Sequence, residues 1–464
     1  MIKKITGYGL NLRSEVEFYE PKTVEEITEI LSNTKLQVGV SIMGSGLSYG
    51  DAFFPNESQN SITISTKKLK TRMVINHKQD LLTVSAGYTL NEVLNSITKH
   101  GYILESLPGI GEVSIGGAIA TNVHGKNSWK VGNFNKNIVS VLTCDRYGKT
   151  QQLKLEEIYS QNLLIGSNLF ILEATIRIIK KPSFSIQYKE ICFDTIEEGI
   201  KLLLISKSKF EFIVGWVDCF NAVDNKPTGR GFLTLANFNA QAATSTSASN
   251  ITSKVNNKII GLDPVRFWKI VRIFYNDMSL KLLNSFKYYT VKLKSASGNL
   301  HEGNFLDWNF IHHKLPELNQ LHYPEGFVEI QAFFPIASAE VSIRKLLDYC
   351  NEHELNSELC GIKIHPPKVG ISEPGFCNSE SISIGIDIGI KKVVKNNSNH
   401  FMVGIIDLVI NLGGNVYLTK DSICNTSQIQ RMYPEYFELI SQFEVSKDSI
   451  FQSRQIQRYL GNNL

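Results

Sequence analysis

The sequence lacks a cysteine framework. Its seven cysteines are odd in number and widely spaced, and no two of them form a CxxC pair. This pattern excludes a disulfide-stapled fold and a zinc site built on paired cysteines. The first residues, Met1 to Tyr8, also lack the apolar core of a signal peptide. We therefore expect a protein of the reducing cytoplasm.

Long apolar runs and a strong excess of charge are absent as well. No uninterrupted run reaches the roughly 18 apolar residues of a membrane span. The 48 basic and 44 acidic residues leave a net charge of +4, which is too small to indicate nucleic acid as a partner. With 464 residues, 42% of them hydrophobic and 20% charged, the composition is that of a globular protein with two domains.

Two nucleotide-binding signatures are missing. The sequence has no Gly-x-Gly-x-x-Gly fingerprint in a βαβ unit with a following acid, and no Gly-Lys-Ser/Thr P-loop. NAD and ATP are therefore not expected. The pair His312-His313 has no accompanying third ligand, so we interpret it as a polar loop feature and expect no metal.

Alternating helix and strand signals fill residues 23 to 180. Capping boxes at Thr23–Glu26 and Thr89–Glu92 predict the start of two helices, and His100-Gly101 predicts the end of the second. Strands are predicted at 37–43 and 81–87. The alternation of these signals indicates a domain that contains both helices and strands in this part of the chain.

Beyond about residue 183 the pattern changes to longer strand-like runs, such as 212–217 and 327–334. These runs predict a second, mainly antiparallel domain. The small, polar segment 240–258 is typical of a mobile loop.

The segment 264–294 combines aromatic residues with seven basic residues and one acid, Asp277, which gives a local charge of +6 by subtraction (7 − 1). A cap helix that packs its apolar face on its own domain explains this pattern, and we favour that interpretation. Peripheral contact with an anionic membrane explains it too.

Two glycine-rich segments, 43–51 and 107–127, carry the strongest functional signal. Glycines allow backbone N–H groups to converge on a phosphate without obstruction by Cβ atoms. In Ser114–Ala120 small residues are so dense that the backbone must approach something flat or charged. Two such segments suit a diphosphate, and a cofactor is the economical explanation.

These segments resemble the FAD-binding domain of the vanillyl-alcohol oxidase (PCMH-type) superfamily, which includes aldonolactone oxidases. Within it, the chain most resembles the decaprenylphosphoryl-β-D-ribose 2'-oxidases. The matching motifs span nearly the whole chain: Ser45–Asp51, Gly116–Ala120, Val123–Asn127, Gly229–Gly231, Gly326–Gln331, Ile384–Asp387, Tyr417–Ser422 and Met432–Pro434.

The resemblance implies an α+β, two-domain PCMH-type FAD-binding fold with a substrate domain inserted on an antiparallel sheet. Residues 1–182 would form the FAD-binding domain, 183–414 the substrate-binding domain, and 415–464 a C-terminal segment that completes the FAD domain.

The same resemblance assigns site residues. The FAD would be held by a set of small and polar residues: Gly44, Ser45, Gly46, Leu47, Ser48, Tyr49, Pro108, Gly109, Ile115, Gly116, Gly117, Asn122, His124, Gly125 and Asn127. The catalytic residues would be Lys420, His124, Tyr49 and Lys126, and the substrate would meet Gln331, Lys363, Ser383 and Gly385.

The implied reaction is the oxidation of an alcohol with hydride transfer to FAD, which requires a base or a cation at the hydroxyl oxygen. A lysine whose pKa is lowered by burial can serve as that base. Lys420 is the first choice and Lys126 the second.

The sequence departs from the family pattern at positions that concern the attachment of FAD and the substrate pocket. Relatives with covalent FAD commonly carry a histidine where Leu47 stands, so we expect non-covalent FAD. The nearest subfamily usually has arginines at Met43 and Leu47, and a glycine in the turn at 168–170. It has asparagine and cysteine at Ser383 and Gly385, which indicates a different substrate pocket.

Three functions stay open at this point. The first is oxidation of a polyprenyl-phosphate-linked sugar for cell-envelope polysaccharide, completed by a separate NAD(P)H-dependent reductase and located at the inner face of the membrane. The second is a soluble aldonolactone or polyol oxidase. The third is a non-catalytic FAD-binding protein.

Overall fold

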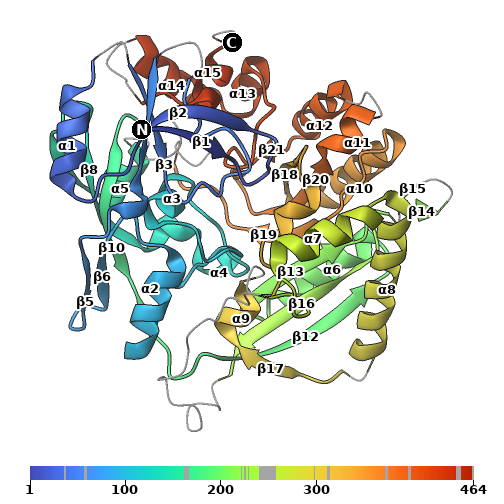
Figure 1. Cartoon of the computed structure of the whole chain (residues 1–464). Coiled ribbons are helices and arrows are strands. Elements are labelled where there is room, and N and C mark those ends of the chain that lie inside the picture. Colours follow the sequence, from blue (N-terminus) through green and yellow to red (C-terminus); the bar gives the residue numbers. More distant parts are fainter. Residues whose placement is uncertain are drawn as a thin grey trace.

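The structure is a computed structural model of the whole chain (Figure 1). It describes all residues except 36–37, 57–59, 161–166, 221, 224–225, 228, 240–257, 297, 311–313, 371–374, 396–398, 446–450 and 462–464. The predicted loop 240–258, apart from Lys258, and the pair His312-His313 lie outside the described residues. Sheets of antiparallel strands combined with helices confirm the α+β class.

The N-terminal part is built on two larger sheets. The first has the order β1-β2-β4-β3, with β1 antiparallel to β2 and the other pairs parallel. Its strands are β1 (Ile2–Thr6), β2 (Arg13–Tyr19), β3 (Gly39–Met43) and β4 (Ser61–Ser65). The second is antiparallel, in the order β5-β6-β10-β8-β9. Its strands are β5 (Met73–Asn76), β6 (Leu81–Ser85), β8 (Ile138–Cys144), β9 (Thr150–Lys154) and β10 (Phe170–Arg177).

The helices in this part of the chain are α1 (Val24–Asn33), α2 (Leu90–Ile97), α3 (Ile115–Ala120), α4 (Ser128–Val131) and α5 (Leu155–Ser160), and β7 (Tyr102–Ile103) pairs with β11 (Ile179–Lys180). Most of these helices pack on the main hydrophobic core of the two sheets, whereas α4 contacts β19 (Cys360–His365) of the second part. Thr23 and Thr89 cap α1 and α2 as predicted, the second with a complete capping box. A 3-10 turn after α2 ends at His100, and Gly101 follows it in the left-handed conformation. These local predictions are confirmed.

The second part is built on an eight-stranded antiparallel sheet, in the order β17-β12-β16-β13-β19-β20-β18-β21. Its strands are β12 (Ser185–Phe193), β13 (Phe212–Val217), β16 (Gly231–Phe238), β17 (His301–Asn304), β18 (Phe327–Pro335), β19 (Cys360–His365), β20 (Ser381–Gly389) and β21 (Asn415–Val416). A hairpin of β14 (Ala222–Val223) and β15 (Lys226–Pro227) lies outside this sheet. The strands predicted at 212–217 and 327–334 are confirmed.

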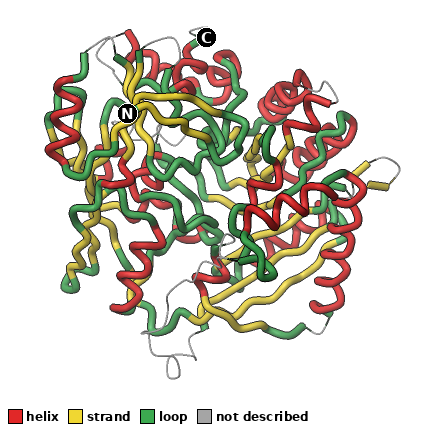
Figure 2. The backbone as a smooth tube through the Cα atoms, in the orientation of Figure 1, coloured by secondary structure: helices red, strands yellow, loops and turns green. Residues whose placement is uncertain are grey.

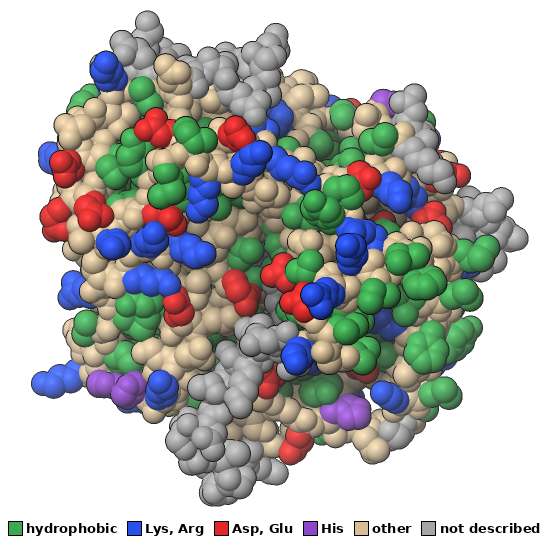
Figure 3. All heavy atoms as spheres, in the orientation of Figure 1, with side chains coloured by type: hydrophobic (Ala, Val, Ile, Leu, Met, Phe, Trp, Pro, Cys, Tyr) green, Lys and Arg blue, Asp and Glu red, His purple; other side chains and the backbone are tan. Residues whose placement is uncertain are grey.

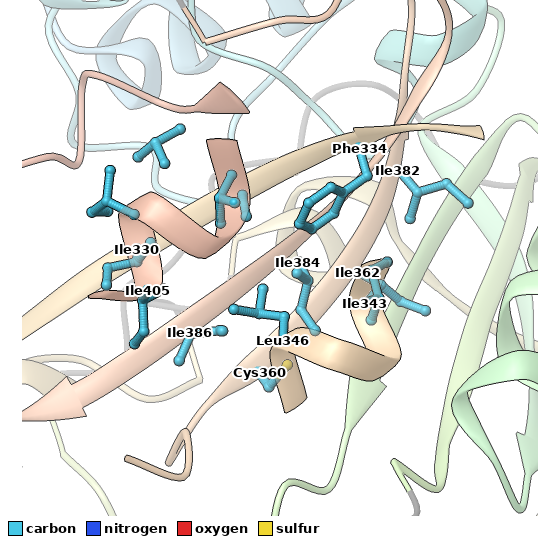
Figure 4. Close-up of a cluster of buried hydrophobic side chains, with 14 of the residues drawn as sticks. Ile330, Phe334, Ile343, Leu346, Cys360, Ile362, Ile382, Ile384, Ile386 and Ile405 are labelled. Atoms are coloured by element: carbon cyan, nitrogen blue, oxygen red, sulfur yellow. The ribbon is translucent and has the colours of Figure 1, made fainter. Parts of the chain in front are cut away.

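One face of this sheet is covered by α6 (Ile196–Ser206), α10 (Ile336–Glu352), α11 (Ile390–Lys395) and α12 (Asn399–Asn411). Figure 4 shows isoleucines of β18 and β20 pointing into this layer. Strands place successive side chains on opposite faces, so the residues between these isoleucines point to the other face. That second face is covered at one end by α8 (Asp277–Ser295) and α9 (Phe305–Asn309), while α7 (Pro264–Val271) packs on the 3-10 turn at Leu318–His322.

The C-terminal segment returns to the N-terminal part, as the red and blue elements of Figure 1 show. Its helices α13 (Thr426–Met432), α14 (Pro434–Val445) and α15 (Arg454–Leu460) share the core of the eight-stranded sheet. The Arg458 guanidinium forms ion pairs with Asp51, 2.7 Å, and with Asp421, 2.9 Å. The segment therefore bridges both parts, and the predicted domain boundaries stay predictions.

Candidate active site

A cavity of about 620 Å³ lies between the glycine-rich segments and the second face of the eight-stranded sheet. This volume is within the usual range of ligand pockets. Figure 2 shows loops gathered between the strands of the two parts, where these segments run. We call the side formed by Gly44–Ser48, Pro108–Gly109 and Gly116–Gly117 the glycine wall, and the side formed by Glu329, Gln331, Lys363, Ser383 and Lys420 the side-chain wall.

The first loop of the glycine wall follows β3. Gly46 has a left-handed backbone, with φ of 71°, and the Met43 side chain occupies the position that a Cβ on Gly46 would need. The backbone N–H groups of Ser45 to Ser48 donate no hydrogen bond to any described residue. Unpaired N–H groups along a cavity are the donors that an anion such as a diphosphate requires.

The second loop leads into α3. The Ser114 side chain accepts a hydrogen bond from the Gly117 N–H, 3.2 Å, and a Cβ on Gly116 would lie 3.1 Å from that of Ala86. Gly109 differs, because a Cβ there would meet only open space. The backbone thus borders the cavity directly. The first loop offers unpaired N–H groups, and the second loop leaves open space beside Gly109. These residues fit FAD.

Four residues predicted to bind FAD lie behind the glycine wall, since Ile115, Asn122, Gly125 and Asn127 are not among the cavity-lining residues. The Asn122 side chain accepts from the Asn135 N–H, 3.0 Å, and that of Asn127 donates to the Glu105 carbonyl, 2.8 Å. They hold the loops in place, and their assignment to the cofactor stays a prediction.

A buried polar chain joins the two walls at His124. The His124 Nε2 lies 3.3 Å from Gln331 Oε1, and the Gln331 amide donates to Ser383 Oγ, 3.0 Å. Ser383 in turn lies 2.7 Å from His365 Nε2. Burial, with Lys363 nearby, holds the pKa of His124 well below its usual value. His124 is therefore neutral at physiological pH.

Lys126 lines the cavity beside α9. Its ammonium donates to both the backbone and the side-chain oxygen of Asn309, at 2.6 and 3.0 Å, and lies 4.9 Å from the centre of the Trp308 ring. Burial lowers the pKa of Lys126 well below the usual lysine value. Asn309 was not predicted, and no local sequence signal connects it with Lys126.

Lys420 reaches the cavity from the turn after β21. Its ammonium forms an ion pair with Glu329 and lies 5.2 Å from the centre of the Tyr49 ring. Burial, followed by the charge of Glu329, raises the pKa of the Tyr49 hydroxyl well above its usual value. Lys420, Tyr49 and His124 therefore line one cavity, as the resemblance predicted, although their catalytic roles stay predictions.

Glu329 and Asp387 are cavity residues that the sequence reasoning did not assign. They face each other across β18 and β20, on the same face as Gln331 and Gly385. Burial, followed by the neighbouring charge of Glu329, raises the pKa of Asp387 well above its usual value. The alternation of Ser-Ile-Ser-Ile-Gly-Ile-Asp-Ile-Gly at 381–389 was the signal that could have revealed Asp387.

The remaining predicted substrate residue, Lys363, lies on β19 opposite Ser383. Burial, followed by the charge of Lys420, lowers the pKa of Lys363 to about 8.

Among the described residues, no group of three histidine, cysteine or acidic side chains could hold a metal ion. All seven cysteines are free thiols.

Comparison with known proteins agrees with this geometry. A family model described as "FAD binding domain" matches residues 17–154. The chain is 22% identical to decaprenylphosphoryl-β-D-ribose oxidase of Mycolicibacterium smegmatis, over 98% of this chain and 97% of that protein.

Other relatives match over a smaller part. D-arabinono-1,4-lactone oxidase of Candida glabrata is 29% identical over 43% of this chain and 38% of its own length. D-lactate dehydrogenase [cytochrome] 1 of Saccharomyces cerevisiae is 29% identical over 39% of this chain and 32% of its own. These relatives are oxidases and dehydrogenases that act on CH–OH groups. With its FAD-binding domain and its relatives of this kind, the chain is an FAD-dependent oxidoreductase.

Proposed function

We propose that this enzyme oxidises a secondary alcohol of a sugar carried on a polyprenyl phosphate, as the first half of an epimerisation. The observation that carries the proposal is the match to a decaprenylphosphoryl-ribose oxidase over nearly all of both chains, which includes the side-chain wall as well as the FAD-binding domain. The lactone oxidase match covers less than half of this chain.

Bound FAD supplies the acceptor for the hydride. The substrate hydroxyl must lose its proton as the hydride leaves, and the Lys420–Glu329 ion pair provides both groups needed for that step. The Lys420 ammonium holds the hydroxyl oxygen, while the Glu329 carboxylate accepts the proton. In this arrangement Lys420 positions the hydroxyl oxygen and Glu329 takes the proton, which differs from the expectation that Lys420 is the base.

The neighbouring groups position the sugar. His124 is neutral and Tyr49 keeps its proton, so both offer hydrogen bonds without adding charge beside the reacting carbon. Gln331 and Ser383 are already linked to each other and to His124, which fixes their orientation before the substrate binds. Lys363 supplies a cation for the phosphate of the substrate.

The cofactor is held without a covalent bond, because Leu47 in the diphosphate loop offers no nucleophile. The 2-keto sugar that forms requires a reduction to complete the epimerisation, so we expect a separate NAD(P)H-dependent reductase as partner.

The test is anaerobic reduction of the FAD-loaded enzyme by a panel of substrates. A short-chain polyprenylphosphoryl pentose is expected to bleach the flavin and to give a product lighter by two hydrogens in mass spectrometry. Free aldonolactones and polyols are the competing substrates. If they bleach the flavin at an equal or higher rate, the enzyme is a lactone or polyol oxidase and the proposal is wrong.

Covalency is tested on the same preparation by acid precipitation. Non-covalent FAD appears as yellow colour in the supernatant, whereas colour retained in the pellet contradicts the assignment of Leu47.

A further inference from the structure

We propose that the outward face of α7 and α8 docks on an anionic lipid bilayer and presents the mouth of the cavity to a lipid-linked substrate. The inference deepens the proposed function. It starts from the two opposite faces of α8, which differ completely in their surroundings.

The inward face of α8 packs on the sheet. Leu280, Asn284 and Tyr288 are buried there, and the Tyr288 ring packs against Trp216 and Phe232. The outward face carries Leu282, Phe286, Tyr289 and Leu293 at spacings of four, three and four residues, which align them in one stripe. Their exposed fractions are 67%, 72%, 56% and 80%.

Further exposed apolar residues precede this stripe in the chain. Ile270 is exposed on α7, Ile273 and Phe274 on the 3-10 turn that follows it, and Met278 at the start of α8. Figure 3 shows hydrophobic side chains gathered over this region, at the right of the view. Soluble surfaces rarely present so many large apolar side chains together, and such a patch marks an interaction site. The favoured expectation, a cap helix packed on its own domain, accounts only for the inward face.

The charges around the stripe select the partner. Arg266, Lys269, Lys281 and Lys294 are exposed in the same segment, whereas its one acid, Asp277, is paired with Lys392. A second copy of this chain would place like charges against each other across a twofold axis. An anionic bilayer instead attracts the basic residues and receives the apolar ones.

The docking surface connects with the site through Lys287. This residue lies on the flank of α8 and lines the cavity together with Trp216 and Phe232, with its ammonium 4.0 Å from the centre of the Trp216 ring. The helix that faces the bilayer is therefore also a wall of the cavity. A sugar phosphate can enter beneath α8 while its polyprenyl tail stays in the membrane.

The test is co-sedimentation of the FAD-loaded enzyme with vesicles of phosphatidylglycerol and phosphatidylcholine, compared with pure phosphatidylcholine. We expect binding to the anionic vesicles, weakened by salt. The double variant Phe286→Asp/Leu293→Asp is expected to lose at least about tenfold in vesicle affinity, because two inserted side chains become charged. The matched control is Ile205→Asp/Val341→Asp, at residues of α6 and α10 whose exposed fractions are 66% and 59%.

Equal binding to both kinds of vesicle, or wild-type binding by the α8 double variant, would overturn the proposal. A dimer seen in light scattering would also overturn it if only the α8 double variant were monomeric, because the face would then be a self-association surface.

Activity measurements separate this proposal from the proposed function. The α8 double variant should turn over a short-chain substrate normally and a vesicle-embedded substrate slowly. If wild type turns over neither while it binds vesicles, the proposed function fails and the docking surface stands.

Discussion

The glycine wall and the side-chain wall of the cavity use opposite means of recognition. The glycine wall offers backbone N–H groups and open space, and its side chains are small or absent. The side-chain wall offers two lysines, a carboxylate, an amide and a hydroxyl, all on elements of the eight-stranded sheet or directly after it. Substitutions in the glycine wall should therefore act by filling space that the cofactor needs. Substitutions in the side-chain wall should act by changing the charge beside the substrate.

The largest effect is expected from Lys420→Met. Without the ammonium that holds the hydroxyl oxygen, kcat should fall roughly 10²–10⁴-fold, while the flavin content stays that of wild type. Steady-state kinetics and the ratio of flavin to protein absorbance measure the two. Lys345→Met, at an exposed position of α10, is the control. A variant that loses FAD but keeps kcat per bound flavin would break the distinction between the walls.

A smaller effect is expected from Gly109→Val on the other wall. The Cβ at this position meets no atom of the chain within 4 Å, so folding is unaffected, but the added methyl groups take space from the cofactor. The dissociation constant of FAD should rise about ten- to hundredfold, as fluorescence titration measures. Gly303→Val, on edge strand β17 away from the cavity, is the control. Unchanged FAD affinity together with a reduced kcat would contradict the prediction.

The smallest effect concerns stability without cofactor. Because the pKa of Lys363 is lowered to about 8, the folded state disfavours the charged lysine, and Lys363→Met should raise the free energy of unfolding at pH 7 by about 1–3 kcal/mol. Between pH 8 and about 10.5 the unfolded wild type binds more protons than the folded protein, so wild-type stability rises with pH. The advantage of the variant should disappear across that interval in urea unfolding. A variant less stable than wild type at pH 7 would show that Lys363 is well solvated or paired.

Sequence reasoning succeeded where the signal is local. The capping boxes at Thr23 and Thr89 and the strand at 212–217 depend on residues a few positions apart. The glycine wall is local in the same sense, since its loops are contiguous. The pairing of Lys420 with Glu329 joins residues 91 positions apart, and no periodicity encodes such a pair. Asn309, the partner of Lys126, was missed for the same reason.

Asp387 is a different case, because its signal was present. The isoleucines of β20 define a buried face, and strict alternation places Ser383, Gly385 and Asp387 together on the other. What the pattern does not contain is the burial on that second face, which depends on the N-terminal part packing against the sheet. That packing shifts the pKa of Asp387 and creates the cavity.

The ion pairs of Arg458 join two segments that leave the ribosome far apart in time. Asp51 belongs to the first glycine-rich segment and emerges early from the ribosome, whereas Asp421, next to Lys420, emerges some 370 residues later. Arg458 joins the two only after α15 has been made. A nascent chain therefore carries the cofactor loops long before it carries the lysine that would use them.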